Sequence, residues 1–114
     1  MSVKMTTRQV GDVTVIDAVG RITLGEGAST FRDTIRNLAQ SGHKKLLLNL
    51  AEVSYIDSSG IGEMVSGFTT VANQGGTMKL LNLTKRVKDL LQITKLYTVF
   101  EVHDDEAAAV RSFS

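Results

Sequence analysis

The sequence predicts an α/β domain with a mixed, mostly parallel sheet of about five strands, an amino-terminal hairpin and about four helices packed on the sheet. Apolar runs rich in β-branched residues alternate with segments whose apolar residues recur every three or four positions, as in amphipathic helices. Strands joined through single helices need crossover connections, which make them parallel. Because 114 residues suffice for one hydrophobic core, we expect a single domain over residues 1–114.

The chain is expected to open with a hairpin. Strands are expected at about 3–9 and 13–19, where β-branched residues are frequent. Gly11-Asp12 lies between them and is typical of a tight two-residue turn. These two strands are therefore predicted to pair in antiparallel orientation.

A helix and the central strand are expected to follow the hairpin. The helix is expected at about 27–40, where apolar residues recur on one face, and Gly42 ends it. Residues 45–50, KLLLNL, form a nearly continuous apolar run, which is typical of a strand buried on both faces. We expect this strand at the centre of the sheet.

The rest of the chain continues the alternation of helix and strand. Apolar residues fall on one helical face from Ser58 until Gly75-Gly76. The later elements are expected as a strand over 77–83, a helix over 84–97, a strand over 97–102 and a short, acidic-started helix over 104–113. The predicted order is β-β-α-β-α-β-α-β-α.

Composition excludes several classes of function. The chain has 13 basic and 12 acidic residues, so its net charge gives no reason to expect a nucleic-acid partner. The absence of cysteine excludes disulfides, thiolate catalysis and cysteine-ligated zinc. The two histidines, His43 and His103, lack the spacing of metal ligands. We expect neither a metal nor a cofactor.

No segment of the sequence has the features of a membrane or export signal. The first residues, MSVKMTTRQVGD, lack the apolar run of a signal peptide, and no later run approaches the length needed to cross a bilayer. We therefore expect a cytoplasmic protein without membrane insertion. The short chain also leads us to expect a monomer when it is not bound to a partner.

The segment YIDSSGIGEMV, residues 55–65, follows the central strand, and functional crevices in parallel sheets lie beyond the carboxyl ends of strands. We expect Ser58 at the N-cap of the next helix, where its hydroxyl would accept a hydrogen bond from an amide of the first turn. Ser59 would be the first helical residue, and Asp57 would add negative charge near the positive helix end. Capping alone explains these three residues without a further function.

The outward face of this helix is unusual because it carries few charged residues. Small or polar residues occupy the positions opposite the apolar stripe, namely Ser59, Gly62, Glu63, Ser66 and Thr70, with Gly67 alongside. Glycine inside a helix costs about 0.5–1 kcal/mol relative to alanine. Gly62 and Gly67 therefore indicate either a surface that another backbone approaches or close packing within the domain.

Enzyme functions have little support in the sequence. Ser58 lacks the glycine two positions earlier that a nucleophile elbow requires, and only His43 or His103 could serve it as a base. A small serine hydrolase is therefore a disfavoured alternative, and we expect no enzymatic activity. The basic stretch TKRVKDLL, residues 84–91, has no interleaved aromatic residue and is typical of a solvated helix face.

Five stretches together carry a family resemblance: the hairpin start, KKLLLNL, AEVSYIDSSGIGEMV, GGTMKLLNL and VKDLLQITKL. Over nearly its whole length the chain closely resembles a STAS domain of the anti-sigma factor antagonist type. The resemblance implies that Ser58, directly after the aspartate, is a phosphate acceptor. It implies a partner switch in which the unphosphorylated protein binds an anti-sigma factor serine kinase and frees a sigma factor. A metal-dependent serine phosphatase would reset the switch. By freeing a sigma factor, the switch would regulate transcription.

The resemblance also implies a partner-binding surface. Its expected residues are Asp57, Ser58, Ser59, Gly60, Gly62, Glu63, Ser66 and Thr23. Thr23 is a departure, because family members commonly carry aspartate at this position of the partner-facing loop, so the contacts of that loop are expected to differ. An alternative role for the same helix face is docking within a larger sensory complex or a membrane lipid transporter.

Overall fold

The computed structural model describes residues 3–114, in which five strands form one sheet in the order β1-β2-β3-β4-β5. The elements are β1 (Val3–Val10), β2 (Val13–Ile22), α1 (Glu26–Gln40), β3 (Lys45–Ile56), α2 (Ser58–Asn73), β4 (Thr77–Leu81), α3 (Lys85–Ile93), β5 (Val102–His103) and α4 (Glu106–Arg111). β1 and β2 are antiparallel, and all other neighbouring strands are parallel. The predicted mixed, mostly parallel sheet with an amino-terminal hairpin is confirmed.

The hairpin turns where the sequence predicts. Val10 pairs with Val13 across the two-residue loop, and Gly11 adopts a φ of 62°. Such a left-handed backbone is strained for residues with a Cβ, which explains the glycine.

Several predicted boundaries are wrong, and those of β3, α3 and β5 differ most from the structure. β3 does not stop at residue 50 but continues to Ile56, because its second half pairs with β2 alone. The polar residues in that half interrupt the apolar run, so the sequence pattern does not predict a strand there. α3 ends at Ile93, just before Lys95 turns the backbone to a φ of 61°. β5 contains only two residues instead of the predicted 97–102.

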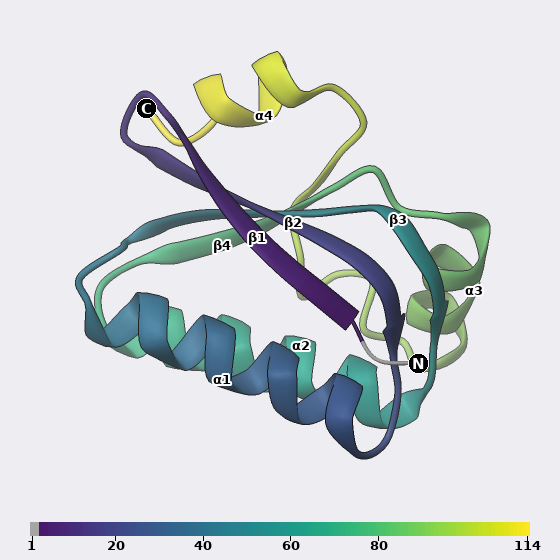
Figure 1. Cartoon of the computed structure of the whole chain (residues 1–114). Coiled ribbons are helices and arrows are strands. Elements are labelled where there is room, and N and C mark those ends of the chain that lie inside the picture. Colours follow the sequence, from purple (N-terminus) through teal and green to yellow (C-terminus); the bar gives the residue numbers. More distant parts are fainter. Residues whose placement is uncertain (1–2) are drawn as a thin grey trace.

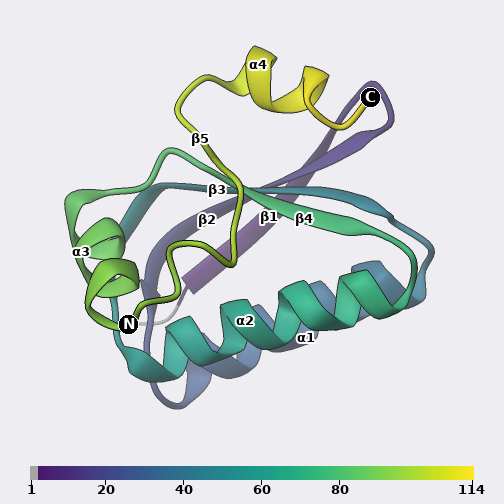
Figure 2. The ribbon, with the colours of Figure 1, turned by 180° about the vertical axis from the view of Figure 1, so that it is seen from behind.

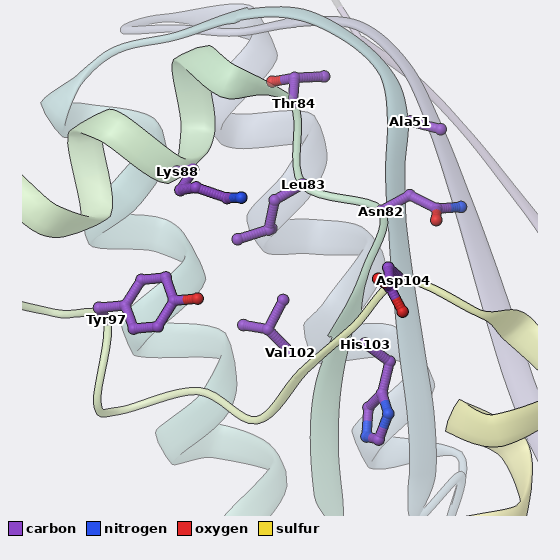
Figure 3. Close-up of a pocket in the computed structure, with 9 residues that line it drawn as sticks. All are labelled: Ala51, Asn82, Leu83, Thr84, Lys88, Tyr97, Val102, His103 and Asp104. Atoms are coloured by element: carbon purple, nitrogen blue, oxygen red, sulfur yellow. The ribbon is translucent and has the colours of Figure 1, made fainter.

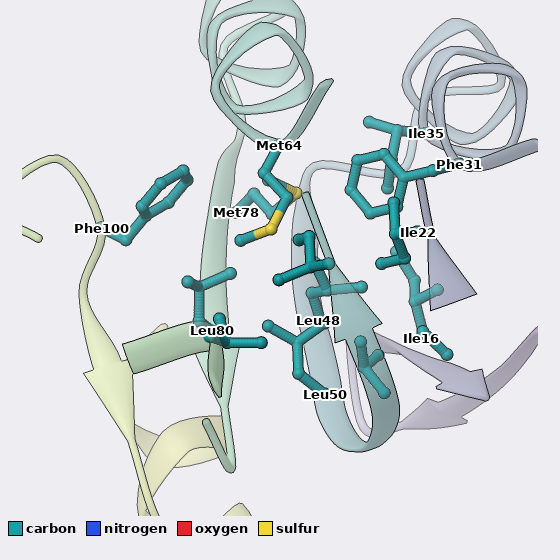
Figure 4. Packing of buried hydrophobic residues seen from close by; sticks show 14 of the residues in the cluster. Ile16, Ile22, Phe31, Ile35, Leu48, Leu50, Met64, Met78, Leu80 and Phe100 are labelled. Carbon is teal, nitrogen blue, oxygen red and sulfur yellow. The ribbon is translucent and has the colours of Figure 1, made fainter. Parts of the chain in front are cut away.

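Helices α1 and α2 lie side by side on one face of the sheet, while α4 lies on the opposite face (Figure 1; Figure 2). The main core fills the space between the sheet and these two helices, as Figure 4 shows for Leu48, Met64 and Phe31. Each fully buried side chain of this size contributes about 1.5–3 kcal/mol relative to its exposed state. The core therefore fixes how α1 and α2 lie against this face of the sheet.

The central strand is buried on both faces, as predicted. Leu46 and Leu48 belong to the main core, whereas Leu47 packs beneath α4 in a second, smaller cluster. Lys79 of β4 binds the carboxyl end of α4. Its Nζ donates a hydrogen bond to the backbone oxygen of Ser112 at 2.9 Å. α4 is thus attached by apolar contacts and by a nearly buried ammonium group.

Candidate functional site

Asp57 connects β3 to α2 and holds two backbone amides with one carboxylate. Its Oδ1 accepts a hydrogen bond from the Gly60 amide at 2.9 Å, and its Oδ2 accepts one from the Leu24 amide at 3.0 Å. The first bond caps α2, and the second attaches the loop between β2 and α1. The prediction that Ser58 is the N-cap is therefore wrong: Asp57 is the N-cap, and Ser58 is the first helical residue.

The backbone conformation explains why Asp57, and not Ser58, is the N-cap of α2. Asp57 has an extended backbone, with φ −113° and ψ −174°, which is the usual N-cap conformation. Ser58 is already the first helical residue, and within residues 3–114 its hydroxyl accepts no hydrogen bond from an amide of the first turn. A carboxylate also has two oxygens, which allows it to serve the helix and the neighbouring loop together.

Electrostatics favour an ionised Asp57. Partial burial acts to raise the pKa of its carboxyl group, but hydrogen bonds from the amides of Leu24, Gly60 and Ser59 lower it, and the resulting pKa lies below the usual value. Amide donors stabilise the charged form of a carboxylate because they point positive charge at it. Asp57 therefore carries its charge beside Ser58 at neutral pH.

Ser58 is exposed on the first turn of α2, and Ser59 next to it is half-buried. Within residues 3–114, the Ser58 hydroxyl forms no hydrogen bond to another side chain or to the backbone. A hydroxyl in this position is accessible to an incoming protein without disturbing the core.

Gly60, expected to bind a partner, is buried inside the domain. A Cβ at this position would overlap the carbonyl oxygen of Ile22 and the side chain of Ile56. Glycine is required here because α2 begins against the end of β2. Gly60 therefore allows close packing within the domain, against the backbone of Ile22.

Gly62 and Gly67 differ from each other in the same helix. Gly62 is exposed, and a Cβ there would meet no atom within 4 Å. A Cβ at Gly67 would lie 3.1 Å from the Ile35 side chain of α1, so the alternative of internal packing holds for Gly67. Ser58, Gly62 and Ser66 are exposed at four-residue intervals and form a stripe along α2, which we call the α2 stripe.

Helix α1 borders the α2 stripe. Arg32 of α1 donates to the carboxylate of Glu63 at 3.1 Å, and the Glu63 side chain is 20% exposed. Thr70 lines a small hollow between the two helices together with Arg32 and Arg36. Sequence reasoning missed both arginines, since their spacing of four places them on one face of α1 but does not show that this face lies beside α2.

The loop between β2 and α1 contributes Thr23 and Leu24 to the same end of the sheet. Thr23 is half-buried, and its carbonyl accepts a hydrogen bond from the Ala28 amide at 2.9 Å. Leu24 is 80% exposed although its amide is held by Asp57. Leu24 was also missed, because a single leucine in a loop has no sequence signal. The fold thus brings Thr23 and Leu24 close to Ser58.

Neither histidine lies where a base for Ser58 would be needed. His43 lies two residues before the start of β3, at the strand end opposite Ser58, and its Nδ1 lies 2.9 Å from the Thr14 hydroxyl. His103 is on the edge strand β5, with its Nε2 2.6 Å from a carboxylate oxygen of Glu101. This arrangement gives no support to the serine hydrolase alternative.

A hollow of about 520 Å³ lies at the carboxyl ends of β4 and β5 (Figure 3). Lys88 and Tyr97 point toward Leu83 and Val102 within it. None of the expected site residues lines it. Thr84, which does line it, already caps α3 through the Val87 amide, so we assign the hollow no role in the site around Ser58.

Comparison with known proteins gives the family. The family model described as "STAS domain" matches residues 4–109. The chain belongs to the STAS domain family. This STAS domain is 32% identical over 102 residues to the anti-sigma-B factor antagonist of Bacillus subtilis (strain 168), a match covering 90% of this chain and 92% of the relative. The resemblance predicted from the sequence is confirmed.

Solved structures share the fold of this STAS domain. An anti-sigma factor antagonist from Mycobacterium paratuberculosis matches with a TM-score of 0.84 and 14% identity, covering 98% of this chain and 94% of the other. The Bacillus cell fate determinant SpoIIAA in its phosphorylated form matches with a TM-score of 0.75 and 19% identity, covering 97% of this chain and 100% of the other. At these identities the matches establish the fold alone.

The described part of the chain holds neither a metal-binding cluster nor a membrane-spanning helix. Between residues 3 and 114, no three His, Asp or Glu side chains gather as they would around a metal ion. In the same range, no helix combines the length and the apolar character needed to cross a membrane.

Proposed function

We propose that this STAS domain is an anti-sigma factor antagonist whose binding is controlled by phosphorylation of Ser58. The observation that carries the proposal is the exposed Ser58 hydroxyl on the first turn of α2, directly after the capping Asp57. The Bacillus subtilis relative, named an anti-sigma-B factor antagonist, matches nearly its full length and supports the class of partner. The partner is an anti-sigma factor with serine kinase activity, which releases a sigma factor when it binds this protein.

The fold accommodates a phosphate at Ser58. A phosphate adds about −1.5 to −2 charges and several strong hydrogen-bond acceptors. At the first turn of a 16-residue helix it lies near the positive end of the helix dipole. SpoIIAA in its unphosphorylated form also shares this fold, with a TM-score of 0.71, which supports a fold that tolerates the modification.

The same phosphate opposes binding of the partner. In a complex that covers the α2 stripe, the phosphate would be desolvated next to the ionised Asp57. A cost of about 3 kcal/mol would weaken binding roughly a hundredfold. Phosphorylation therefore releases the partner while the domain stays folded, which is the requirement of a reversible switch.

The partner switch needs two enzymes besides this protein. The anti-sigma factor kinase transfers phosphate to Ser58, and a metal-dependent serine phosphatase removes it. Because sigma factors act on transcription, we place this protein in the cytoplasm with them.

The proposal is tested by incubating the protein with a candidate anti-sigma factor kinase and ATP, followed by phosphopeptide mass spectrometry. Phosphate is expected on Ser58 and absent from Ser58→Ala, whereas Ser41→Ala, which changes an exposed serine at the end of α1, keeps the modification. Calorimetry should show binding of the unphosphorylated protein that weakens about a hundredfold in Ser58→Asp. Phosphate found on Ser59 alone, or equal binding by Ser58→Asp, would contradict the proposal.

A further inference from the structure

Two arginines share one aromatic ring near the carboxyl ends of β2 and β3. The central guanidinium carbon of Arg21 lies 5.1 Å from the centroid of the Tyr55 ring, and that of Arg86 lies 4.3 Å from it. Arg21 comes from β2, Tyr55 from β3 and Arg86 from the first turn of α3. We call these three residues the arginine–tyrosine patch. Attraction to the ring holds both cations in place although both arginine side chains are exposed.

The charge of this patch is not neutralised. Within residues 3–114, neither arginine forms an ion pair. Among the acidic residues nearest to Arg21 and Arg86 along the chain, Asp17 pairs with Arg8 at 2.7 Å and Asp89 pairs with Lys85 at 2.7 Å. Within residues 3–114, Glu26 and Glu52, the only carboxylate of β3, form no ion pair. The patch thus presents two preorganised positive charges on a protein of net charge +1.

The patch lies within a few residues of the proposed switch site along both β2 and β3. Arg21 is followed by Ile22, whose carbonyl packs against the start of α2, and then by the loop that carries Leu24. Tyr55 precedes Asp57 by two residues on the same strand end. A protein that covers Ser58 and Leu24 needs to extend only a few residues along β2 and β3 to reach the patch.

We infer that the arginine–tyrosine patch binds an acidic segment of the anti-sigma factor that docks at Ser58. The inference rests on the proposed function and adds a second, electrostatic contact to it. Guanidinium groups pair with carboxylates through two parallel hydrogen bonds, and arginine and tyrosine are enriched in protein interfaces. Charges at the rim of an interface steer association, so the patch acts chiefly on the rate of binding.

Sequence reasoning assigned residues 84–91 to a solvated face because no aromatic residue interleaves with its basic residues. The fold supplies that aromatic residue from β3, about 30 positions away, by packing α3 beside the far half of this strand. Arg86 and Lys85 therefore make different contacts. Arg86 lies over the Tyr55 ring, whereas Lys85 forms an ion pair with Asp89 of the same helix.

The test measures the association rate with the anti-sigma factor that phosphorylates Ser58, by stopped-flow fluorescence at several salt concentrations. Arg21→Glu and Arg86→Glu are each expected to slow association about tenfold at low salt and to flatten its salt dependence. Arg86→Gln should give an intermediate rate. Arg111→Glu makes the same change in net charge on α4, at the other end of the sheet, and should associate like the wild type. Circular dichroism checks that each variant is folded.

Competition gives an independent measurement. Polyglutamate should slow association of the wild type but not of the doubly substituted Arg21→Glu, Arg86→Glu protein. Rates of Arg21→Glu and Arg86→Glu equal to that of Arg111→Glu would overturn the inference, as would patch-dependent binding to phosphatidylglycerol vesicles with an unchanged association rate. If Ser58→Asp weakens binding but the patch variants do not, the patch alone is refuted. If the wild type binds no anti-sigma factor, the proposed function and the patch both fail.

Discussion

Replacing Asp57 by alanine removes the two hydrogen bonds that join the start of α2 to the loop before α1. Loss of an N-cap costs about 0.5–2 kcal/mol, and loss of a second hydrogen bond to a charged acceptor adds about 1 kcal/mol. The free energy of unfolding of Asp57→Ala should therefore fall by about 1.5–3 kcal/mol. For a domain of this size, that lowers Tm by roughly 6–12 °C.

Ser58→Ala is the matched comparison, because it changes the neighbouring residue, whose hydroxyl is exposed and caps nothing. Its stability should stay within about 0.5 kcal/mol of the wild type. Asp57→Asn keeps one acceptor oxygen and should lose about half as much as Asp57→Ala.

Thermal and urea unfolding followed by circular dichroism measure these differences. The reasoning would be refuted if Ser58→Ala lowered Tm as much as Asp57→Ala, since Ser58 would then be the cap. A Tm of Asp57→Ala within a degree or two of the wild type would show that neither hydrogen bond contributes.

Two further predictions concern packing and pH. Gly60→Ala should destabilise the domain by about 1–3 kcal/mol through overpacking, whereas Gly62→Ala should stabilise it by about 0.5–1 kcal/mol; equal Tm changes in the two variants would contradict the distinction. Hydrogen bonds from Lys79 and then from His103 hold the pKa of the Glu101 carboxyl at about 2. Because the folded pKa lies below the ordinary value, this stabilisation is complete above about pH 4.5 and is lost as the pH falls toward 2. As the pH falls over this range, the Tm of Glu101→Gln should therefore decrease less than that of the wild type. Identical profiles of Tm against pH would contradict this role of Glu101.

Much of the fold could be predicted because it depends on local patterns. The run from Leu46 to Leu50 identifies the central strand, since a strand buried on both faces has few polar residues. Gly11 identifies the hairpin turn, since the backbone there is left-handed. Strand ends were harder to predict: the second half of β3 pairs on one side only, and its polar residues resemble those of a loop.

The sequence by itself determined the α/β order, the family resemblance and the place of Ser58 after the central strand. Only the tertiary structure decided which residue caps α2, because the second amide on Asp57 belongs to Leu24, 33 residues earlier. It also separated glycines that look alike in sequence and brought Arg21 and Arg86 to one ring. The physical reason is the same in each case: periodicity shows which face of an element is buried, but the groups that meet that face come from distant parts of the chain.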